Sequence, residues 1–405
     1  MKYLIVVFDG MADVPLPALG GKTPMMVAKT PTLDKLCPTA EVGMVLNVPQ
    51  GMVPESDTAN LSILSYSPLL YSKGRSPLEA VSMGLEMKDS DVAYRANLVT
   101  LSEGETYENR IMLDHSADEI STEEGRALIA YLNEHIGDKA KRFFGGISYR
   151  HCLLWDGGDE TVPFARPHDI IGREIDAYLP KGEKGAPFLL MMKESAALLQ
   201  NHPINLARVA EGKKPANSLW FWSPGKKPAL PSFKEKWGIR AAVISAVDLI
   251  RGIGLCANMD VLYVEGATGT LDTNYQGKAN AAISAFEDGA DLVFIHVEGP
   301  DECSHRGEMQ NKITAISNID QYILAPVFDY LSQNGEDFRI LALPDHPTST
   351  LTRTHCPDAV PYLLWHSDKV CAGIASFCEE TAKATDIYLP SGTVLMEKLL
   401  STRGV

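Results

Sequence analysis

The sequence lacks the features of a membrane protein, of a disulfide-stapled secreted protein and of a nucleic-acid-binding protein. No apolar stretch approaches the length of a membrane span, and the first apolar run, residues 3–8, is too short for a signal peptide and ends in a charge. Seven cysteines, an odd number without a Cys-x-x-Cys pair, predict reduced thiols in a cytoplasmic protein. Lys and Arg number 37 against 52 Asp and Glu. The resulting net charge of −15 disfavours a nucleic-acid partner and makes any phosphate site depend on local metals and arginines.

Aspartate and histidine concentrate in two short segments near the C-terminus, Asp301 to His305 and Asp345-His346 followed by His355. Carboxylate oxygen and imidazole nitrogen suit Zn²⁺ or Mn²⁺, and a site built from both usually carries out chemistry. A single Asp-His pair is most often a surface feature. Because two such segments occur here, we predict a metal site.

Each of these segments follows an apolar run typical of a strand, residues 291–297 in the first case and 338–343 in the second. A third such run, Tyr3 to Phe8, ends at Asp9-Gly10. Ligands at the carboxyl ends of strands lie where open α/β sheets bind their substrates. Three clusters at three strand ends favour one shared site over three unrelated turns, and Asp9 joins the candidate ligands.

A candidate nucleophile, Ser56, lies in the segment Pro54-Glu55-Ser56-Asp57-Thr58-Ala59-Asn60-Leu61-Ser62, after a Gly-Met-Val-Pro loop and before a helical stretch. The N-terminus of a helix offers free N–H groups and a positive dipole to a phosphate. A serine there is ordinarily an N-cap. A neighbouring divalent ion would instead lower the pKa of its hydroxyl and make it a nucleophile for phosphoryl transfer.

Together these segments resemble the cofactor-independent phosphoglycerate mutases of the archaeal type, members of the alkaline phosphatase superfamily. The likeness runs over nearly the whole chain and is carried by Val-Phe-Asp9-Gly10, Glu55 to Ser62, Gly74-Arg75 to Ala80, Ala93 to Leu98, Gly266 to Tyr275, His296 to His305, and Asp345-His346 with His355. The nucleophile and metal segments together are specific to this family, whereas any one of them alone would not be. The resemblance implies an α/β fold, with an alkaline-phosphatase-like discontinuous catalytic domain and an inserted α+β cap domain.

The resemblance also implies two divalent metal ions, manganese or zinc, and a division of the ligands between them. Asp301, His305 and His355 would hold one ion. The other ion would be held by Asp9, Asp345, His346 and the Ser56 oxygen. All of these positions carry the residue types that the family uses.

The segments expected to recognise the substrate depart from the family pattern. Archaeal mutases carry an arginine-rich Asp-Arg-Arg-Ala-Gly-Arg segment where this chain has 108–118 with one arginine, and Trp222-Ser-Pro-Gly replaces an Arg-Gly-x-Gly turn. Other residues do not reproduce arginine's bidentate recognition of carboxylate and phosphate. Histidine in a substrate cleft can hold a substrate or shuttle its proton. The candidate substrate-binding residues are Arg75, Arg95, Arg110, Arg150, His151, His168 and Arg251.

Our leading hypothesis is a mutase that passes the substrate's phosphoryl group to Ser56 and returns it to a different hydroxyl, interconverting 3- and 2-phosphoglycerate. The altered arginine pattern also resembles a branch of the family proposed to act as homoserine kinase, which would take the phosphoryl group from a nucleotide. A phosphomonoesterase is a third possibility. A catalytically inactive protein that only binds a metal or a phosphorylated metabolite is disfavoured, because the full set of candidate metal ligands is present. The expected partner is a small phosphorylated metabolite, while the sequence predicts no oligomeric state.

The positions of the motifs predict two domains. A chain of 405 residues is too long for one ordinary core, and the candidate ligands lie at both ends with none in the middle. We expect a metal-binding catalytic domain from residues 1–72 and 229–405 and a substrate-binding cap from 73–228, with a linker near Lys226 to Pro231. Within the cap, the segment that starts at Ser121 has the pattern of a capped amphipathic helix.

Overall fold

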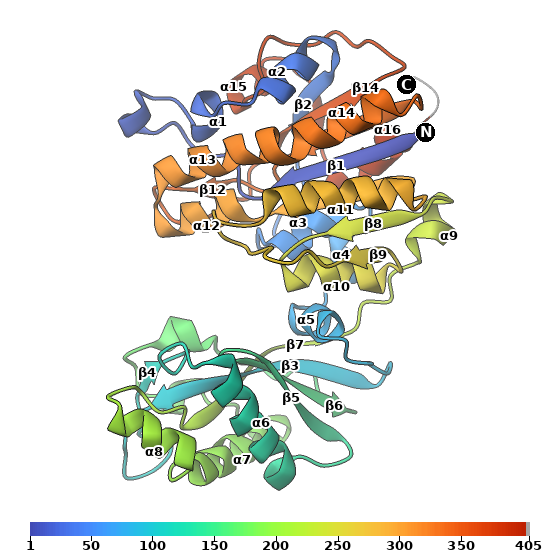
Figure 1. Cartoon of the computed structure of the whole chain (residues 1–405). Coiled ribbons are helices and arrows are strands. Elements are labelled where there is room, and N and C mark those ends of the chain that lie inside the picture. Colours follow the sequence, from blue (N-terminus) through green and yellow to red (C-terminus); the bar gives the residue numbers. More distant parts are fainter. Residues whose placement is uncertain (402–405) are drawn as a thin grey trace. The chain divides into compact units, whose positions relative to one another are not determined.

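The computed structural model of the chain describes residues 1–401 (Figure 1). The chain divides into two compact units. Unit 1 consists of Met1–Ser72 and Ala229–Val405, and unit 2 is Lys73–Pro228. Unit 1 is therefore built from both ends of the sequence, and unit 2 is an insertion within it. Among the described residues, no helix is long and apolar enough to cross a membrane.

Unit 1 is built on a mixed sheet in the strand order β15-β2-β14-β11-β1-β10-β8-β9. The five strands β11, β1, β10, β8 and β9 are parallel to one another. Strand β14 is antiparallel to β11 and β2, and β15 is parallel to β2. Their bounds are β1 (Lys2–Phe8), β2 (Glu41–Val45), β8 (Ala241–Ile244), β9 (Asp260–Leu262), β10 (Leu292–Val297), β11 (Phe338–Leu343), β14 (Val360–His366) and β15 (Tyr388–Leu389). Two short strands, β12 (Thr348–Ser349) and β13 (Thr354–His355), form a separate antiparallel pair.

Helices cover both faces of this sheet (Figure 1). The β1 face that carries Leu4, Val6 and Phe8 packs against a helical layer, and α10 packs on the opposite face, where Gly254 approaches Val243. Burial on both faces explains why β1 is an almost uninterrupted apolar run. The helices of unit 1 are α1 (Pro24–Val27), α2 (Pro31–Leu36), α3 (Ser56–Ile63), α4 (Pro68–Tyr71), α9 (Phe233–Trp237), α10 (Asp248–Cys256), α11 (Tyr275–Glu287), α12 (Gly299–Arg306), α13 (Met309–Ile319), α14 (Ala325–Gln333), α15 (Glu379–Lys383) and α16 (Leu395–Leu400).

The register of the three central strands aligns their carboxyl ends. Phe8 of β1 pairs with Val297 of β10, and Val7 pairs with Leu343 of β11. The residues that follow these strands must therefore emerge side by side at one edge of the sheet. The three predicted strand runs are confirmed, with starts that differ by at most one residue from the expected ones.

Unit 2 is an antiparallel sheet covered by helices. Its long central strand β3 lies between β6 and β7, and β4 and β5 extend the sheet. Alternate residues of β3 face opposite sides: Tyr94 and Ala96 join the main apolar core, whereas Ala93 packs in a smaller cluster with Ala80 of α5. The bounds are α5 (Ser76–Ser82), β3 (Asp91–Leu101), β4 (Met112–Asp114), α6 (Thr122–Ile136), β5 (Lys141–Ile147), β6 (Arg150–Asp156), α7 (Gly182–Leu199), α8 (Pro203–Ala210) and β7 (Ser218–Lys226).

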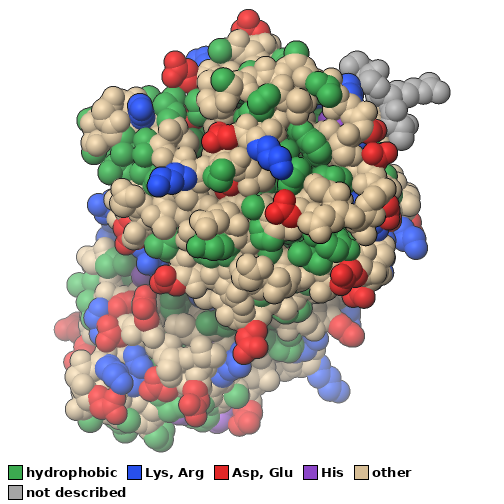
Figure 2. All heavy atoms as spheres, turned by 45° about the horizontal axis from the view of Figure 1, so that its top comes forward, with side chains coloured by type: hydrophobic (Ala, Val, Ile, Leu, Met, Phe, Trp, Pro, Cys, Tyr) green, Lys and Arg blue, Asp and Glu red, His purple; other side chains and the backbone are tan. Residues whose placement is uncertain are grey.

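The predicted helix start at Ser121 is confirmed. Ser121 is the N-cap of α6, and its Oγ accepts a hydrogen bond from the backbone N–H of Glu124 at 3.2 Å and donates one to the Glu124 carboxylate at 2.9 Å. On the molecular surface, acidic and basic side chains are interspersed over the face shown in Figure 2.

Candidate metal centre

The predicted carboxylate and imidazole ligands of unit 1 lie together at the carboxyl edge of the central strands. Asp9 follows β1, Asp345 and His346 follow β11, and His355 ends β13, whereas Asp301 and His305 are four residues apart and so share one face of α12. One ligand atom from each of Asp301, His346 and His355 lies within 4.8 Å of the other two. The same holds for Asp9, Asp345 and His346. His346 thus lies between the two groups.

Asp301 has two imidazole neighbours, His305 and His355, whose tautomers are fixed by the backbone. The Nδ1 of His305 lies 2.9 Å from the Arg353 carbonyl, and the Nδ1 of His355 lies 2.5 Å from the Pro54 carbonyl. A carbonyl only accepts, so each Nδ1 carries the proton and each neutral ring has a lone pair on Nε2. Both Nε2 atoms point at Asp301, at 3.2 Å from Oδ2 for His305 and 3.4 Å from Oδ1 for His355.

The second group is buried and centred on His346. Its Nε2 lies 3.6 Å from Asp9 Oδ1 and 3.6 Å from Asp345 Oδ2, while its Nδ1 lies 3.2 Å from the hydroxyl of Thr348. Asp9 is 1% exposed, and neither of its carboxylate oxygens accepts a hydrogen bond from the described residues. Buried carboxylate oxygens are rarely left in this state unless they bind a cation.

Electrostatics in the site also fit divalent cations. Burial and the neighbouring carboxylates of Asp345 and Asp301 raise the pKa of Asp9 well above its usual value. The pKa of Asp301 is held well below its usual value, because hydrogen bonds from His305 and His355 outweigh the effect of burial. The hydrogen bond to Asp301 raises the pKa of His305 to about 9. In the metal-free protein, a proton therefore occupies the position between imidazole and carboxylate that a cation would take.

Ser56 lies at this site. It is not the N-cap of its helix, which is the ordinary role of a serine at a helix start. Glu55 is the N-cap of α3, and Ser56 is the first helical residue. The Ser56 hydroxyl oxygen lies 3.2 Å from Nε2 of His346, the residue between the two ligand groups. The hydroxyl is thus directed at the candidate metal centre.

Three supporting residues were not among the candidate site residues predicted from the sequence. Asn60, one helical turn after Ser56, donates from Nδ2 to Asp345 Oδ2 at 2.9 Å and to the Ser56 carbonyl at 2.8 Å. Thr348 donates to Asp301 Oδ1 at 2.5 Å, and so links that carboxylate to His346. His296 lies with its Nε2 3.1 Å from Asp9 Oδ2. Asn60 and His296 stand in motifs of the family resemblance, but only the structure gives them partners.

A buried lysine and a glutamate flank the Asp9 side of the site. Glu298, Asp9 and Asp301 each offer an oxygen within 4.8 Å of the others. Lys278 is fully buried and donates to the His296 carbonyl at 3.3 Å. Burial lowers the pKa of Lys278 to about 8, against the opposing charge of Glu298. Gly269 packs closely on this glutamate, since a Cβ at that position would clash with the Glu298 Oε2.

Among the candidate substrate residues, Arg251 belongs to unit 1. Its Nε donates to the Ser245 carbonyl at 2.8 Å, and its guanidinium carbon lies 4.9 Å from the centroid of the Tyr263 ring. The Ser245 hydroxyl lies 3.4 Å from Nδ1 of His296. Arg251 is therefore two contacts away from the imidazole beside Asp9.

The remaining candidates belong to unit 2, and Arg95 is already engaged there. Its guanidinium forms a bidentate pair with Glu79, with an Nε–Oε2 distance of 2.6 Å, and stacks 4.6 Å from the ring centroid of Trp222. The exposed fractions of the two charged side chains are only 12% and 18%. This geometry indicates that Arg95 stabilises the unit.

A series of rings continues from Trp222 along unit 2. The centroid of His168 lies 5.5 Å from Trp222 and 6.0 Å from His115, and His115 lies 5.5 Å from Tyr149. Two other candidates lie outside this series: Arg75 precedes α5, and Arg110 lies 5.6 Å from the Tyr107 ring. Within the series, exposed Arg150 lies over the Tyr149 ring at 5.4 Å. Arg150 and His168 thus have exposed side chains at the end and in the middle of this series of rings.

His151 has a different environment from the one we predicted. It is 3% exposed, and its Nδ1 accepts a hydrogen bond from the Gly146 N–H at 3.1 Å. Burial, together with nearby Arg126, lowers the pKa of His151 to about 3. A neutral, enclosed imidazole is unsuited to holding an anionic substrate or to shuttling its proton near neutrality, so we remove His151 from the substrate set.

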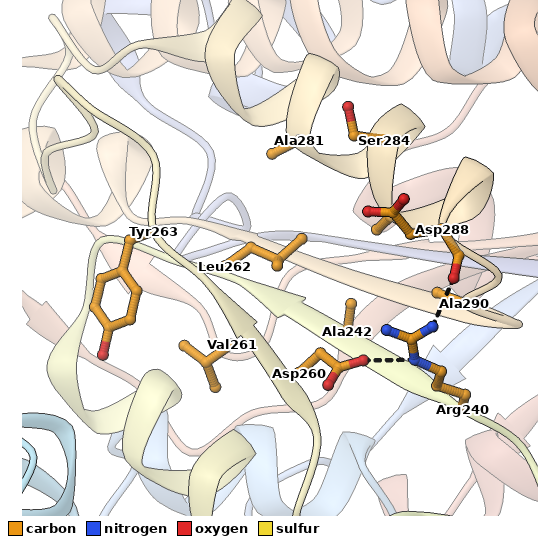
Figure 3. A pocket seen from close by; sticks show the side chains of 11 residues that line it. Arg240, Ala242, Asp260, Val261, Leu262, Tyr263, Ala281, Ser284, Asp288 and Ala290 are labelled. Atoms are coloured by element: carbon orange, nitrogen blue, oxygen red, sulfur yellow. Dashed lines mark hydrogen bonds and ion pairs between the residues drawn. The ribbon is translucent and has the colours of Figure 1, made fainter.

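A hollow of about 490 Å³ lies elsewhere in unit 1, along the edge strand β9 and the helix α11 (Figure 3). Its main cation, Arg240, already binds Asp260 Oδ2 at 2.8 Å and the Asp288 carbonyl at 2.6 Å. The rest of the lining is largely alanine and aliphatic side chains, with no predicted site residue. We assign this hollow no role.

The helix-covered mixed sheet of unit 1, with unit 2 inserted into it, defines an α/β fold, which confirms the predicted fold class. The chain belongs to the 2,3-bisphosphoglycerate-independent phosphoglycerate mutase family, whose family model matches residues 38–205. It is 44% identical to the enzyme of that name from Methanosarcina barkeri over 100% of both chains. A solved structure of a Pyrococcus horikoshii protein matches with a TM-score of 0.82 and 28% identity, over 100% of this chain and 99% of that one. The cofactor-independent phosphoglycerate mutase of Thermoplasma acidophilum matches with a TM-score of 0.68 and 24% identity, over 100% of both chains.

Proposed function

We propose that this chain interconverts 3- and 2-phosphoglycerate through a phosphoserine intermediate on Ser56. The observation that carries the proposal is the 3.2 Å distance between the Ser56 hydroxyl and Nε2 of His346, inside a convergent set of carboxylates and imidazoles. Membership of the mutase family supports the choice of reaction. For this reason we favour the mutase over homoserine kinase.

We assign Asp301, His305 and His355 to one divalent ion and Asp9, Asp345, His346 and Ser56 to the other, with Mn²⁺ or Zn²⁺ as the metals. Bound ions would lower the pKa of the Ser56 hydroxyl and neutralise the charge of the phosphoryl oxygens. The chain's own contribution is orientation. The backbone carbonyls that hold Nδ1 of His305 and of His355 direct both Nε2 lone pairs inward, and Asn60 fixes the Asp345 carboxylate.

In the proposed reaction, the ester bond between phosphorus and the substrate oxygen breaks as a bond to Ser56 Oγ forms. The serine hydroxyl loses one proton, and the departing substrate oxygen gains one to become a hydroxyl of glycerate. The second step reverses these changes at the other hydroxyl of glycerate. Unit 2 would act as the cap that binds the substrate and keeps water from the phosphoserine. Arg75, Arg110, Arg150, His168 and Arg251 remain our candidates for substrate contact, and Arg95 remains with a mainly structural role. All seven cysteines are free thiols, which supports the cytoplasmic location we propose.

The purified protein, loaded with Mn²⁺, should be offered 3-phosphoglycerate without any nucleotide or bisphosphoglycerate. The proposal expects formation of 2-phosphoglycerate. Phosphorylation of homoserine only when ATP is added would establish the kinase instead, and release of inorganic phosphate alone would establish a phosphatase. Rapid acid quenching during turnover, followed by mass spectrometry, should find phosphate on the peptide that contains Ser56.

A further inference from the structure

A fully buried ion pair lies behind the metal centre and is not part of it. The ammonium of Lys312, on α13, lies 3.0 Å from Asp13 Oδ2, and both side chains are 0% exposed. The ammonium also donates to the Thr348 carbonyl at 2.8 Å and to the Ala12 carbonyl at 3.4 Å. Its three protons therefore have three acceptors on two different segments, 12–13 and 348.

Asp13 joins the same two segments from the opposite side. Its Oδ2 also accepts from the Thr350 hydroxyl at 2.6 Å and from the Thr350 N–H at 3.1 Å. The backbone adds one further link, because the Thr348 N–H donates to the Ala12 carbonyl at 3.0 Å. Lys312 and Asp13 thus clamp the loop that follows Asp9 onto the hairpin that follows Asp345 and His346.

The clamped hairpin controls ligands of both groups. The Thr348 hydroxyl donates a hydrogen bond to Asp301 Oδ1, and the same hydroxyl lies 3.2 Å from the Nδ1 of His346. The backbone of Thr348 pairs with that of His355 in the β12–β13 hairpin. The fit is tight: a Cβ on Gly10 would lie 2.6 Å from the Thr348 hydroxyl oxygen and 2.7 Å from Asp301 Oδ1. A shift of Thr348 would therefore move ligands of both ions at once.

We propose that the Lys312–Asp13 pair is a positioning device of the metal centre, which holds the Asp9 loop and the 345–350 hairpin at the separation that two ions require. A buried ion pair contributes little net stability, because desolvation of the two charges offsets their attraction. An apolar pair of similar volume would fill the same space. The directed hydrogen bonds from one ammonium to two ligand-bearing segments are what an apolar pair could not reproduce.

The test compares Lys312→Met, Asp13→Asn and the double variant with the wild type. Each protein is melted, and its Kd for Mn²⁺ alone is measured by competition with a chromophoric chelator. Each single variant leaves one buried charge without its partner and should lower Tm. The double variant removes both charges and should recover most of that loss, yet bind Mn²⁺ about 10- to 100-fold more weakly than the wild type, the loss typical of disturbed outer-shell contacts.

The matched control is Asp320→Asn, another fully buried carboxylate, whose oxygens accept from the N–H groups of Thr32 and Leu33 on α2. It should lower Tm without changing the Kd for Mn²⁺. A folded double variant with a Kd within twofold of the wild type, or an equal loss of affinity in the control, overturns the inference. Should the double variant fail to melt cooperatively, the near-isosteric Asp13→Asn is judged by the same thresholds. The inference rests on the proposed metal centre: a wild type that binds no Mn²⁺ refutes the centre itself, whereas unchanged variants refute only the clamp.

Discussion

The Nε2 atoms of His305 and His355 face each other at 2.9 Å. The Nδ1 proton of each ring is donated to a backbone carbonyl, so in two neutral rings both Nε2 atoms would carry lone pairs, and these would face each other. One additional positive charge between them resolves this contact. The raised pKa of His305 supplies this charge in the metal-free protein as a proton on that ring, and in the loaded protein a metal ion would supply it.

We therefore expect Mn²⁺ binding to release a proton between about pH 6.5 and 9. The hydrogen bond with Asp301 raises the pKa of His305 from 6.5 to about 9. The His305 ring is therefore charged at pH 8 in the metal-free protein and must lose that proton to bind an ion. Because the folded pKa is the higher one, this contact stabilises the metal-free protein fully below pH 6.5, and its contribution is lost as pH rises through about 9. Titration calorimetry in buffers of different ionisation enthalpy measures the release. His305→Ala should release fewer protons, whereas exposed His135→Gln should match the wild type.

Replacement of Ser56 by alanine should separate chemistry from stability. Ser56 is the first residue of α3 and not its N-cap, so we expect Ser56→Ala to change the free energy of unfolding by less than about 1 kcal/mol. Phosphoglycerate isomerisation should fall by roughly four orders of magnitude or more, because the nucleophile is gone. Ser62→Ala is the control on the same helix, since the Ser62 hydroxyl has no hydrogen-bond partner within residues 1–401. Retained turnover in Ser56→Ala would exclude the covalent route.

Asn60 should be required for affinity at the ion that Asp345 binds. Asn60→Ala removes the amide that fixes one Asp345 oxygen, and we expect Mn²⁺ affinity to fall about tenfold at one of two sites. Asn205→Ala is a matched comparison in unit 2, because that buried amide donates to the carbonyls of Leu199 and Ala216. The comparison variant should lose stability and keep its affinity. Equal affinities in all three proteins would contradict the assigned role.

The pair between Arg95 and Glu79 should act mainly on stability. Glu79→Gln weakens a bidentate pair that is mostly buried, and we expect it to cost about 2 kcal/mol of unfolding free energy. Arg95→Met should cost a similar amount. Denaturant unfolding measures both, and the KM for 3-phosphoglycerate shows whether Arg95 also binds substrate. A stable Arg95→Met variant with a strongly raised KM would reverse our assignment.

The candidate ligand residues were predictable because they are local features of the sequence. Asp9, Asp301 and Asp345 each follow a run whose apolar character identifies a buried strand, and carboxyl ends of parallel strands lie on one edge. The strand order that makes β10, β1 and β11 adjacent has no local signature. The fold class therefore came from the family resemblance, and the register came from the structure.

The supporting contacts were not predictable for a related reason. Lys312 and Asp13 are 299 positions apart, and the other buried residues of the helix that carries Lys312 are isoleucine and alanine. Nothing in the sequence distinguishes this lysine from a solvated one. The burial of His151 is similar: a histidine in a strand faces either the core or the solvent, and the sequence around it did not indicate which.

The strand order of unit 1 also determines when this protein can fold during its synthesis. The central strand β1 is made first, but its two neighbours, β10 and β11, end at residues 297 and 343. At ribosomal rates of 5–20 residues per second, β1 waits roughly 20 to 70 seconds for its second partner. The strands of unit 2 all lie within residues 73–228 and are complete well before that. The nascent chain must therefore keep an apolar first strand unpaired while the inserted unit is already fully synthesised.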